Sequence, residues 1–197
     1  MILLSSTFRQ ANTPSPDALG KDADCRLLWR FPPRRLEAEA IRDCTLQVSG
    51  VLDLTMGGPG FSAFEVQREN VRHYFPKKMF GPSDWRRMVY MTKVRQEQDA
   101  VFGAFDCPDG NQVIPKRSRS TTPLQALNLF NSHFVNQQAA KFAERVGAGG
   151  VESAFRLAYG RAPSAAELAD SEEFIARHGL AAFCRAILNT NEFLFVF

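Results

Sequence analysis

The chain has 197 residues, of which 45% are hydrophobic and 23% are charged, a composition typical of a globular domain. Its formal net charge of +3 is too small an excess to favour nucleic acid as the partner. No apolar run reaches the roughly 18 residues that span a bilayer, and the apolar residues 1–4 are too few for a signal peptide. We therefore expect a soluble, unexported chain of one domain, or one domain with an appendage.

Residues 1–24 predict an N-terminal arm. They open on a short apolar run and continue through Thr13-Pro14-Ser15-Pro16, a sequence typical of a loop. The opening run is similar to the end of an element whose beginning is missing, so we expect the chain to be a C-terminal piece of a larger protein. The remaining residues, 25–197, are expected to form a single helical domain.

The first strong helix pattern follows Pro32-Pro33. Apolar residues recur at helical spacing from Leu36 to Val48. Gly50 stands where a helix commonly ends in a residue of left-handed conformation. The sequence therefore predicts a helix over residues 34–49.

The middle third, residues 52–114, has no sustained helical or alternating pattern. Glycine and proline interrupt it at Gly57-Gly58-Pro59-Gly60, at Phe75-Pro76 and at Gly81-Pro82. We expect long loops here. One short strand is predicted over residues 88–91, because its valine and tyrosine favour a pleated surface.

The C-terminal third predicts a helical bundle. Thr122-Pro123-Leu124-Gln125 combines an N-cap, a proline at the first helical position and a glutamine at the third, and Ser164-Ala165-Ala166-Glu167 is a second capping box. Helices are predicted from residue 122 and over residues 134–146, 151–159, 164–178 and 180–188. The apolar tail 193–197 is expected to pack on this bundle or on a partner, since each large apolar side chain left in water costs about 1.5–3 kcal/mol. The expected fold class is mainly α: an irregular helical domain with long loops in its middle third and a C-terminal helical bundle.

Metal and cofactor sites are not indicated. The four cysteines are scattered without a C-x-x-C pair, and His73, His133 and His178 stand apart from one another. The chain also lacks a nucleophile elbow, a phosphate loop, a dinucleotide fingerprint and a His-Glu zinc motif. We assign no metal and no cofactor to this chain, and the common enzyme classes are disfavoured.

Arginine, aspartate and their polar neighbours are dense in the loops. The candidate residues for binding or for pinning the loops are Arg35, Arg42, Asp43, Arg87, Tyr90, Asp106, Asp109, Arg117 and Gln125. Guanidinium groups bind oxyanions through paired hydrogen bonds, so these residues could grip an anionic ligand or a glycan. Alternatively, they pair with one another and fix the long loops. Asp106 and Asp109 could also act as an acid and base pair in glycoside hydrolysis.

Several blocks of the sequence resemble the planctomycete domain of unknown function 1553, in its C-terminal part only. The residues Leu27-Leu28-Trp29-Arg30 and Arg34-Arg35-Leu36-Glu37-Ala38-Glu39-Ala40-Ile41-Arg42-Asp43 are similar to that family's hallmark helix. Further blocks follow in order: Met56-Gly57-Gly58-Pro59, the FDxPD-like Phe105-Asp106-Cys107-Pro108-Asp109, the R-x-x-S-T-x-P-x-Q-A-L-x-x-L-N segment over residues 117–131, and Leu188-Asn189-Thr190-Asn191-Glu192-Phe193. Cys107 stands where the family commonly has an aromatic residue, a change that leaves both aspartates in place.

The resemblance implies a biological setting. Family members are typically longer, exported proteins, in which this domain follows another uncharacterised domain and often a cytochrome c module. By resemblance, we expect an accessory or interaction domain of a multidomain extracytoplasmic protein linked to redox or polysaccharide use, although this chain has no signal peptide. Haem is expected only in the missing upstream modules. The expected partners are upstream domains of the same protein, or a separate chain that carries them.

The rival expectation is a carbohydrate-active enzyme domain. Its pocket of carboxylates and arginines would be built from Asp106, Asp109, Arg87, Tyr90 and Arg117. This function requires the two aspartates to face a common cleft, with their carboxyl groups about 5–9.5 Å apart. Binding of nucleic acid would instead require one continuous basic stripe.

Overall fold

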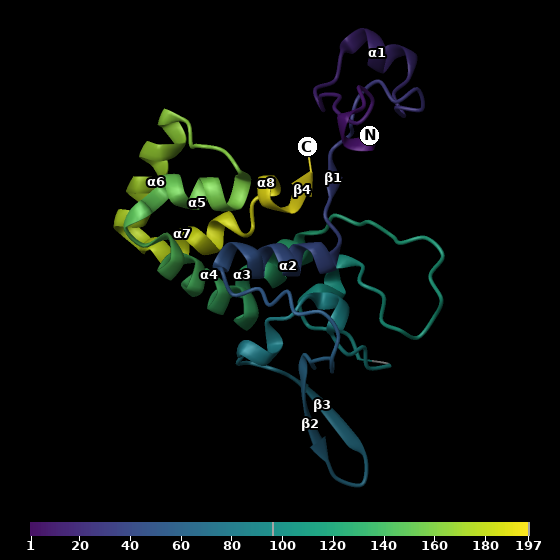
Figure 1. The fold of residues 1–197 in the computed structure, drawn as a ribbon, viewed down its shortest axis with the longest axis vertical. Coiled ribbons are helices and arrows are strands. Elements are labelled where there is room, and N and C mark those ends of the chain that lie inside the picture. The colour runs from purple at the N-terminus through teal and green to yellow at the C-terminus, as the bar shows by residue number, and fades with distance from the viewer. Residues whose placement is uncertain (96, 197) are drawn as a thin grey trace.

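The computed structural model describes residues 1–95 and 97–196, and the chain is mainly α-helical (Figure 1). The α-helices are α1 (Pro16–Lys21), α2 (Ala38–Ser49), α3 (Pro123–Asn131), α4 (His133–Val146), α5 (Gly150–Tyr159), α6 (Ala165–His178), α7 (Leu180–Ile187) and α8 (Asn191–Leu194). Short 3-10 helices are η1 (Ile2–Leu4), η2 (Pro82–Asp84), η3 (Met88–Tyr90), η4 (Phe102–Phe105) and η5 (Gly147–Gly149). Strands β1 (Arg34–Arg35) and β4 (Phe195–Val196) form one antiparallel pair, and β2 (Phe64–Arg68) and β3 (Arg72–Pro76) form another. None of the helices in the described part of the chain is long and apolar enough to cross a bilayer.

The core lies where α2 meets the C-terminal helices. α4 packs against α2, α3 and α7, and α5 and α6 lie beyond α7 (Figure 1). Ile41 of α2, Phe142 of α4 and Cys184 of α7 are completely buried at this contact. Burial raises the pKa of the Cys184 thiol to about 12, so this cysteine packs as a small apolar residue.

The first predicted helix begins at residue 38 and not at residue 34. Arg34 and Arg35 are extended because they pair with β4, in the register Arg34↔Val196 and Arg35↔Phe195. The predicted end of the helix is confirmed. Gly50 has φ 81°, a left-handed conformation in which glycine avoids the clash of a Cβ atom.

The apolar tail docks on the chain itself. Phe193 and Leu194 are buried, and the Leu36 N–H donates to the Leu194 carbonyl at 2.8 Å, beside the β1–β4 pair. The expected packing is confirmed for Phe193 and Leu194, whereas Val196 is 45% exposed and pairs with Arg34 in the β1–β4 ladder. Phe197 lies outside the described residues. The pairing joins the start of the helical part to its end.

The strand predicted over residues 88–91 is wrong, since this segment contains η3. The Tyr90 N–H donates to the Arg87 carbonyl at 3.0 Å, and the Met91 N–H donates to the Met88 carbonyl at 2.9 Å. These local bonds wind the chain into a turn. Only Met91 makes a bridge to an extended neighbour, at Phe61.

The β2–β3 hairpin was not predicted, and it projects from the rest of the molecule in Figure 1. Its register runs from Phe64↔Pro76 to Arg68↔Arg72. Phe64 is the one buried residue of β2, and the alternation of apolar Phe64 and Val66 with polar Glu65 and Gln67 covers only four residues, too few to mark a strand in the sequence.

The helix starts predicted in the C-terminal third are confirmed. α3 begins at Pro123, where the Gln125 side chain accepts a hydrogen bond from the Thr122 N–H at 3.3 Å. At α6 the Ser164 hydroxyl accepts from the Glu167 N–H at 3.3 Å, and the Glu167 carboxylate accepts from the Ser164 N–H at 2.7 Å. The helices predicted over residues 134–146, 151–159 and 180–188 are α4, α5 and α7.

The N-terminal residues, up to about Pro33, lie beyond β1 and apart from the helical body in Figure 1. Local hydrogen bonds hold this segment together. The Asp22 carboxylate accepts from the Arg26 and Leu27 N–H groups at 2.9 and 2.7 Å. The Trp29 indole donates to the Asp22 carbonyl at 2.8 Å. The segment thus includes the expected arm over residues 1–24 and continues past it.

Candidate functional site

Asp106 lies at the centre of a network that joins three of the sequence blocks. Its carboxylate accepts a hydrogen bond from the Arg35 guanidinium at 2.6 Å and from the Ser120 N–H at 2.8 Å. The Ser120 hydroxyl lies 3.0 Å from each carboxylate oxygen. The Gln125 amide donates in turn to the Ser120 hydroxyl and to the Ala104 carbonyl, both at 3.0 Å. The network therefore fixes the loops around residues 106 and 120 onto β1 and α3.

Arg35 is the buried cation of this network. Only 5% of its side chain is exposed, and its guanidinium lies over the Phe105 ring, 5.1 Å from the centroid. Among the described residues, Nε and Nη1 of Arg35 have no hydrogen-bond partner. Asp106 is thus its main polar partner. Because the pair is largely buried, removing one of the two charges is expected to destabilise the fold.

Arg117 makes a second and more exposed set of ion pairs. Its Nη1 lies 2.7 Å from the Glu39 carboxylate and 3.1 Å from that of Glu37, and Arg119 lies 3.5 Å from Glu37. Burial raises the pKa of Glu39, but the hydrogen bond and charge of Arg117 outweigh it and lower that pKa below its ordinary value. Sequence reasoning did not name Glu37 and Glu39 as partners, although both stand in the same block as Arg35.

A third group joins Arg42 and Asp43 of α2 to Arg87, which directly precedes η3. The Asp43 carboxylate accepts from the Met88 N–H at 2.7 Å and from Arg87 Nε at 3.2 Å. Arg42 donates to the backbone carbonyls of Asp84, the last residue of η2, and of Arg86, between η2 and η3. These contacts anchor the segment from η2 to η3 on α2.

Tyr90 and Asp109 stand outside these three groups. The Tyr90 hydroxyl accepts from the Gly57 N–H at 2.8 Å, and the Arg86 guanidinium lies over its ring, 3.9 Å from the centroid. Asp109 accepts from the N–H and the side-chain amide of Asn111 at 2.9 and 2.7 Å, and these bonds lower the pKa of Asp109. The candidate residues therefore do not converge on one point.

Asp106 and Asp109 nevertheless border one cavity. Its volume is about 350 Å³, and Arg117 also lines it. Asp106 is held there by Arg35 and Ser120, and Asp109 by its own turn. The cavity therefore brings together three residues of the enzyme hypothesis, with both carboxylates already engaged in hydrogen bonds.

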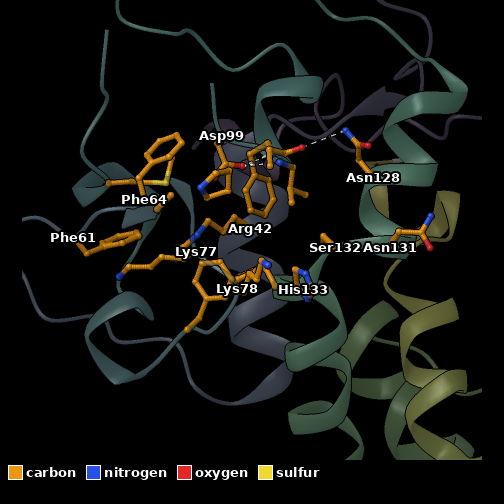
Figure 2. A pocket seen from close by; sticks show the side chains of 18 residues that line it. Arg42, Phe61, Phe64, Lys77, Lys78, Asp99, Asn128, Asn131, Ser132 and His133 are labelled. Carbon is orange, nitrogen blue, oxygen red and sulfur yellow. Dashed lines mark hydrogen bonds between the residues drawn. The ribbon is translucent and has the colours of Figure 1, made fainter. Parts of the chain in front are cut away.

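A second cavity, the aromatic pocket, lies where α2, the hairpin base and the α3–α4 junction meet (Figure 2). Its volume is about 340 Å³. Phenylalanine rings dominate its walls: Phe61, Phe64, Phe80, Phe102 and Phe134. Phe134 packs edge-on against Phe80 and Phe102, with ring centroids 5.3 and 5.6 Å apart. Packed rings of this kind make a preformed apolar site.

Arg42 gives the aromatic pocket a positive charge. It is 2% exposed, and its guanidinium lies 4.6 and 5.2 Å from the ring centroids of Phe61 and Phe134. Asp43, the carboxylate that pairs with it, is 4.0 Å away. Burial lowers the pKa of Arg42 to about 10, a value that still leaves it charged at neutral pH.

Polar groups surround the opening of the aromatic pocket (Figure 2). Lys77 pairs with Asp84 at 2.6 Å, while Lys78 and His133 are exposed. Asp99 accepts hydrogen bonds from two backbone N–H groups of the η4 segment, at 2.6 and 3.0 Å. The lining thus carries both signs of charge, with cations in excess.

Sequence reasoning found only Arg42 of the residues that line the aromatic pocket. The other walls come from segments far apart in the chain, so no local motif marks them. The one available hint was composition, with 17 phenylalanines in 197 residues. In residues 1–95 and 97–196, no three His, Cys, Asp or Glu side chains gather as metal ligands would.

Comparison of the chain with curated proteins and with solved structures finds no match. A family model described as "PSD1: Protein of unknown function (DUF1553)" matches residues 1–175. The match covers every candidate residue, including the three blocks that Asp106 joins. The chain therefore belongs to the DUF1553 family.

Proposed function

We propose that this chain is a non-catalytic accessory domain, which binds other domains within a multidomain extracytoplasmic protein. The observation that carries the proposal is the engagement of Asp106, whose two carboxylate oxygens bond to Arg35 and Ser120. A carboxyl group held in this way stabilises loops and is poorly placed to act as an acid, base or nucleophile. The dense polar residues then serve to hold long loops on a helical body.

The proposed partners are upstream domains of the same protein, or a separate chain that carries them. Ile2, Leu3 and Leu4 are 76%, 68% and 77% exposed, and Leu27 is 80% exposed. Large apolar side chains gain free energy when they leave water, so this N-terminal segment favours contact with another surface. In this proposal, haem and any link to polysaccharide use belong to the partner modules and not to this chain.

Calorimetric titration with the domain encoded immediately upstream tests the proposal. We expect saturable binding, weakened at least about tenfold by Leu3→Ser combined with Leu27→Ser, because both lie in the apolar N-terminal segment. Val113→Ser is the matched control, since Val113 is 95% exposed in a different part of the chain. Absence of binding to every upstream domain would contradict the accessory role.

The second candidate is a carbohydrate-active enzyme domain. It is favoured by one observation, the cavity of about 350 Å³ that Asp106, Asp109 and Arg117 line together. Release of reducing sugar from a panel of polysaccharides tests it, with Asp109→Asn as the variant. Activity that disappears in Asp109→Asn without loss of stability would establish the enzyme and overturn the non-catalytic proposal.

A further inference from the structure

The aromatic pocket around Arg42 has the size and walls of a small-molecule site. Its volume of about 340 Å³ falls in the range of roughly 300–1,000 Å³ that such sites occupy. Figure 2 shows Arg42 at the centre of the lining side chains, between Lys77 and Ser132. An apolar body would fill the space between the phenylalanine rings, while its polar end would meet Arg42.

The charge of Arg42 is only partly compensated. Its hydrogen bonds go to backbone carbonyls, while Asp43, 4.0 Å away, and the more distant Asp99 and Asp84 act on it through their charges alone. The lining adds the cations Lys77 and Lys78 against one carboxylate, that of Asp99. Lys77 is paired with Asp84, and Asp99 is bound to backbone N–H groups. Because Arg42 makes no hydrogen bond to a carboxylate among the described residues and Lys78 is exposed at the rim, a ligand carboxylate is the favoured partner for these two cations.

The start of α4 also borders the pocket. α4 has 14 residues, and its first turn, at Ser132, His133 and Phe134, lines the pocket. The Ser132 hydroxyl accepts from the Val135 N–H at 3.0 Å. The preceding N–H groups of the turn belong to the positive end of α4, where an anion is stabilised, whereas the last carbonyls of α3, which ends at Asn131 in the same lining, oppose this effect.

We propose that the aromatic pocket binds a small amphipathic carboxylate, with its apolar or aromatic body between the phenylalanine rings and its carboxylate toward Arg42 and the start of α4. A neutral sugar fits less well, because its hydroxyl groups would face rings that offer no hydrogen bond. A cationic ligand would be repelled by the positive charge of Arg42. The inference extends the proposed function, which assigns this pocket no ligand.

Titration calorimetry of the whole chain with 4-phenylbutyrate and with its uncharged amide tests the ligand class. We expect the acid to bind at least about tenfold more tightly, because hydrogen bonds to a charged group are about twice as strong as neutral ones. The difference should shrink as salt is added. Equal affinity for the two compounds, or no saturable binding of the acid, would overturn the proposal.

Variants at the rim locate the binding. Ala100 is exposed and lines the pocket, so Ala100→Trp should block the opening without disturbing the core and abolish binding of 4-phenylbutyrate. Lys78→Gln should weaken it several-fold. Lys116→Gln is the charge-matched control outside this pocket and should have no effect. Unchanged binding in both rim variants would place the ligand elsewhere and reject the proposal.

Arg42→Gln should abolish binding of the acid while leaving weak binding of the amide. Because Arg42 also holds the segment between η2 and η3, this variant could lose its fold, and circular dichroism shows whether it has. In that event, the rim variants and the acid–amide comparison decide the outcome.

A peptide that ends in a phenylalanine carboxylate presents the same chemistry from a different source. If such a peptide binds more tightly than 4-phenylbutyrate, the occupant is a protein tail and the proposal of a free small acid is overturned. Failure of all these titrations leaves the accessory role untouched, because titration with the upstream domain tests that role separately.

Discussion

Arg35 and Arg117 make ion pairs of similar length in two different surroundings. Arg35 lies 2.6 Å from Asp106, and Arg117 lies 2.7 Å from Glu39. The side chain of Arg35 is 5% exposed, whereas that of Arg117 is 37% exposed. Water screens the exposed pair, and it can solvate either charge if the other is removed. A buried charge that loses its partner is not solvated in this way, so its loss costs more. Distance alone therefore says little about which contact holds the loops.

The largest effect is expected for Arg35→Ala. We expect it to lower the free energy of unfolding by about 3–5 kcal/mol, because Asp106 is left without its charged partner in a largely buried place. Urea denaturation measures the loss. Adding Asp106→Ala should recover part of it, since the unpaired carboxylate is then removed. A loss below about 1 kcal/mol would show that burial does not strengthen this pair.

A smaller effect is expected where the contact is a hydrogen bond at an exposed helix start. Ser164→Ala removes the hydroxyl that accepts from the Glu167 N–H, so we expect a loss of about 0.5–2 kcal/mol. Thermal and urea denaturation of the variant check it. Ser118→Ala, in a loop outside any helix, is the control and should change stability little. A denaturation midpoint of Ser164→Ala identical to that of the unaltered chain would show that the Ser164 cap does not stabilise the fold.

Arg117→Ala should cost only about 0–1 kcal/mol, because its pairs with Glu37 and Glu39 stand in water. The remaining loss should disappear at about 1 M salt, where the Debye length is short. The Arg35→Ala loss should persist under the same conditions. If Arg117→Ala destabilises the chain as much as Arg35→Ala does, the contrast between the two sites fails.

The smallest expected effect is on the pH dependence of stability, and it arises at the exposed cluster of Arg161, Glu167 and Glu192. Hydrogen bonds from Arg161 and from the Ser164 N–H lower the pKa of Glu167 from its ordinary value of 4.5 to about 2. Its contribution to stability is therefore present above about pH 4.5 and is lost as the pH falls toward 2. Glu167→Gln should flatten this part of the stability curve. An unchanged slope between those pH values would show that solvent screening cancels the pKa shift.

The helices were largely predictable because their boundaries are set by neighbouring residues. Gly50 ends α2, and Ser164 with Glu167 begins α6, through contacts that span a few residues. The start of α2 was misplaced because Arg34 and Arg35 pair with residues near the other end of the chain. The hairpin was missed because its strands are short and almost wholly exposed, so no sustained apolar pattern marks them.

The candidate site was predictable only as a set of residues. The sequence identified Arg35, Asp106 and Gln125. It did not show that Ser120 forms hydrogen bonds with both Asp106 and Gln125, or that Glu39 forms an ion pair with Arg117. Arg35 is 71 residues from Asp106 and Arg117 is 78 from Glu39, and the spacing of charges along a loop contains no information on which of them will meet.

The sequence by itself determined the helical composition and most helix boundaries, since these depend on short-range preferences of the backbone and on hydrophobic spacing, and it contains the blocks that mark the family. The tertiary structure decided that Arg35 and Arg42 are buried, how β1 pairs with β4, and that five phenylalanines line one pocket with Arg42. Burial is a property of the packed chain, because it arises only when distant segments exclude water from the same place. The energies of these ion pairs and the chemistry of the aromatic pocket follow from that exclusion.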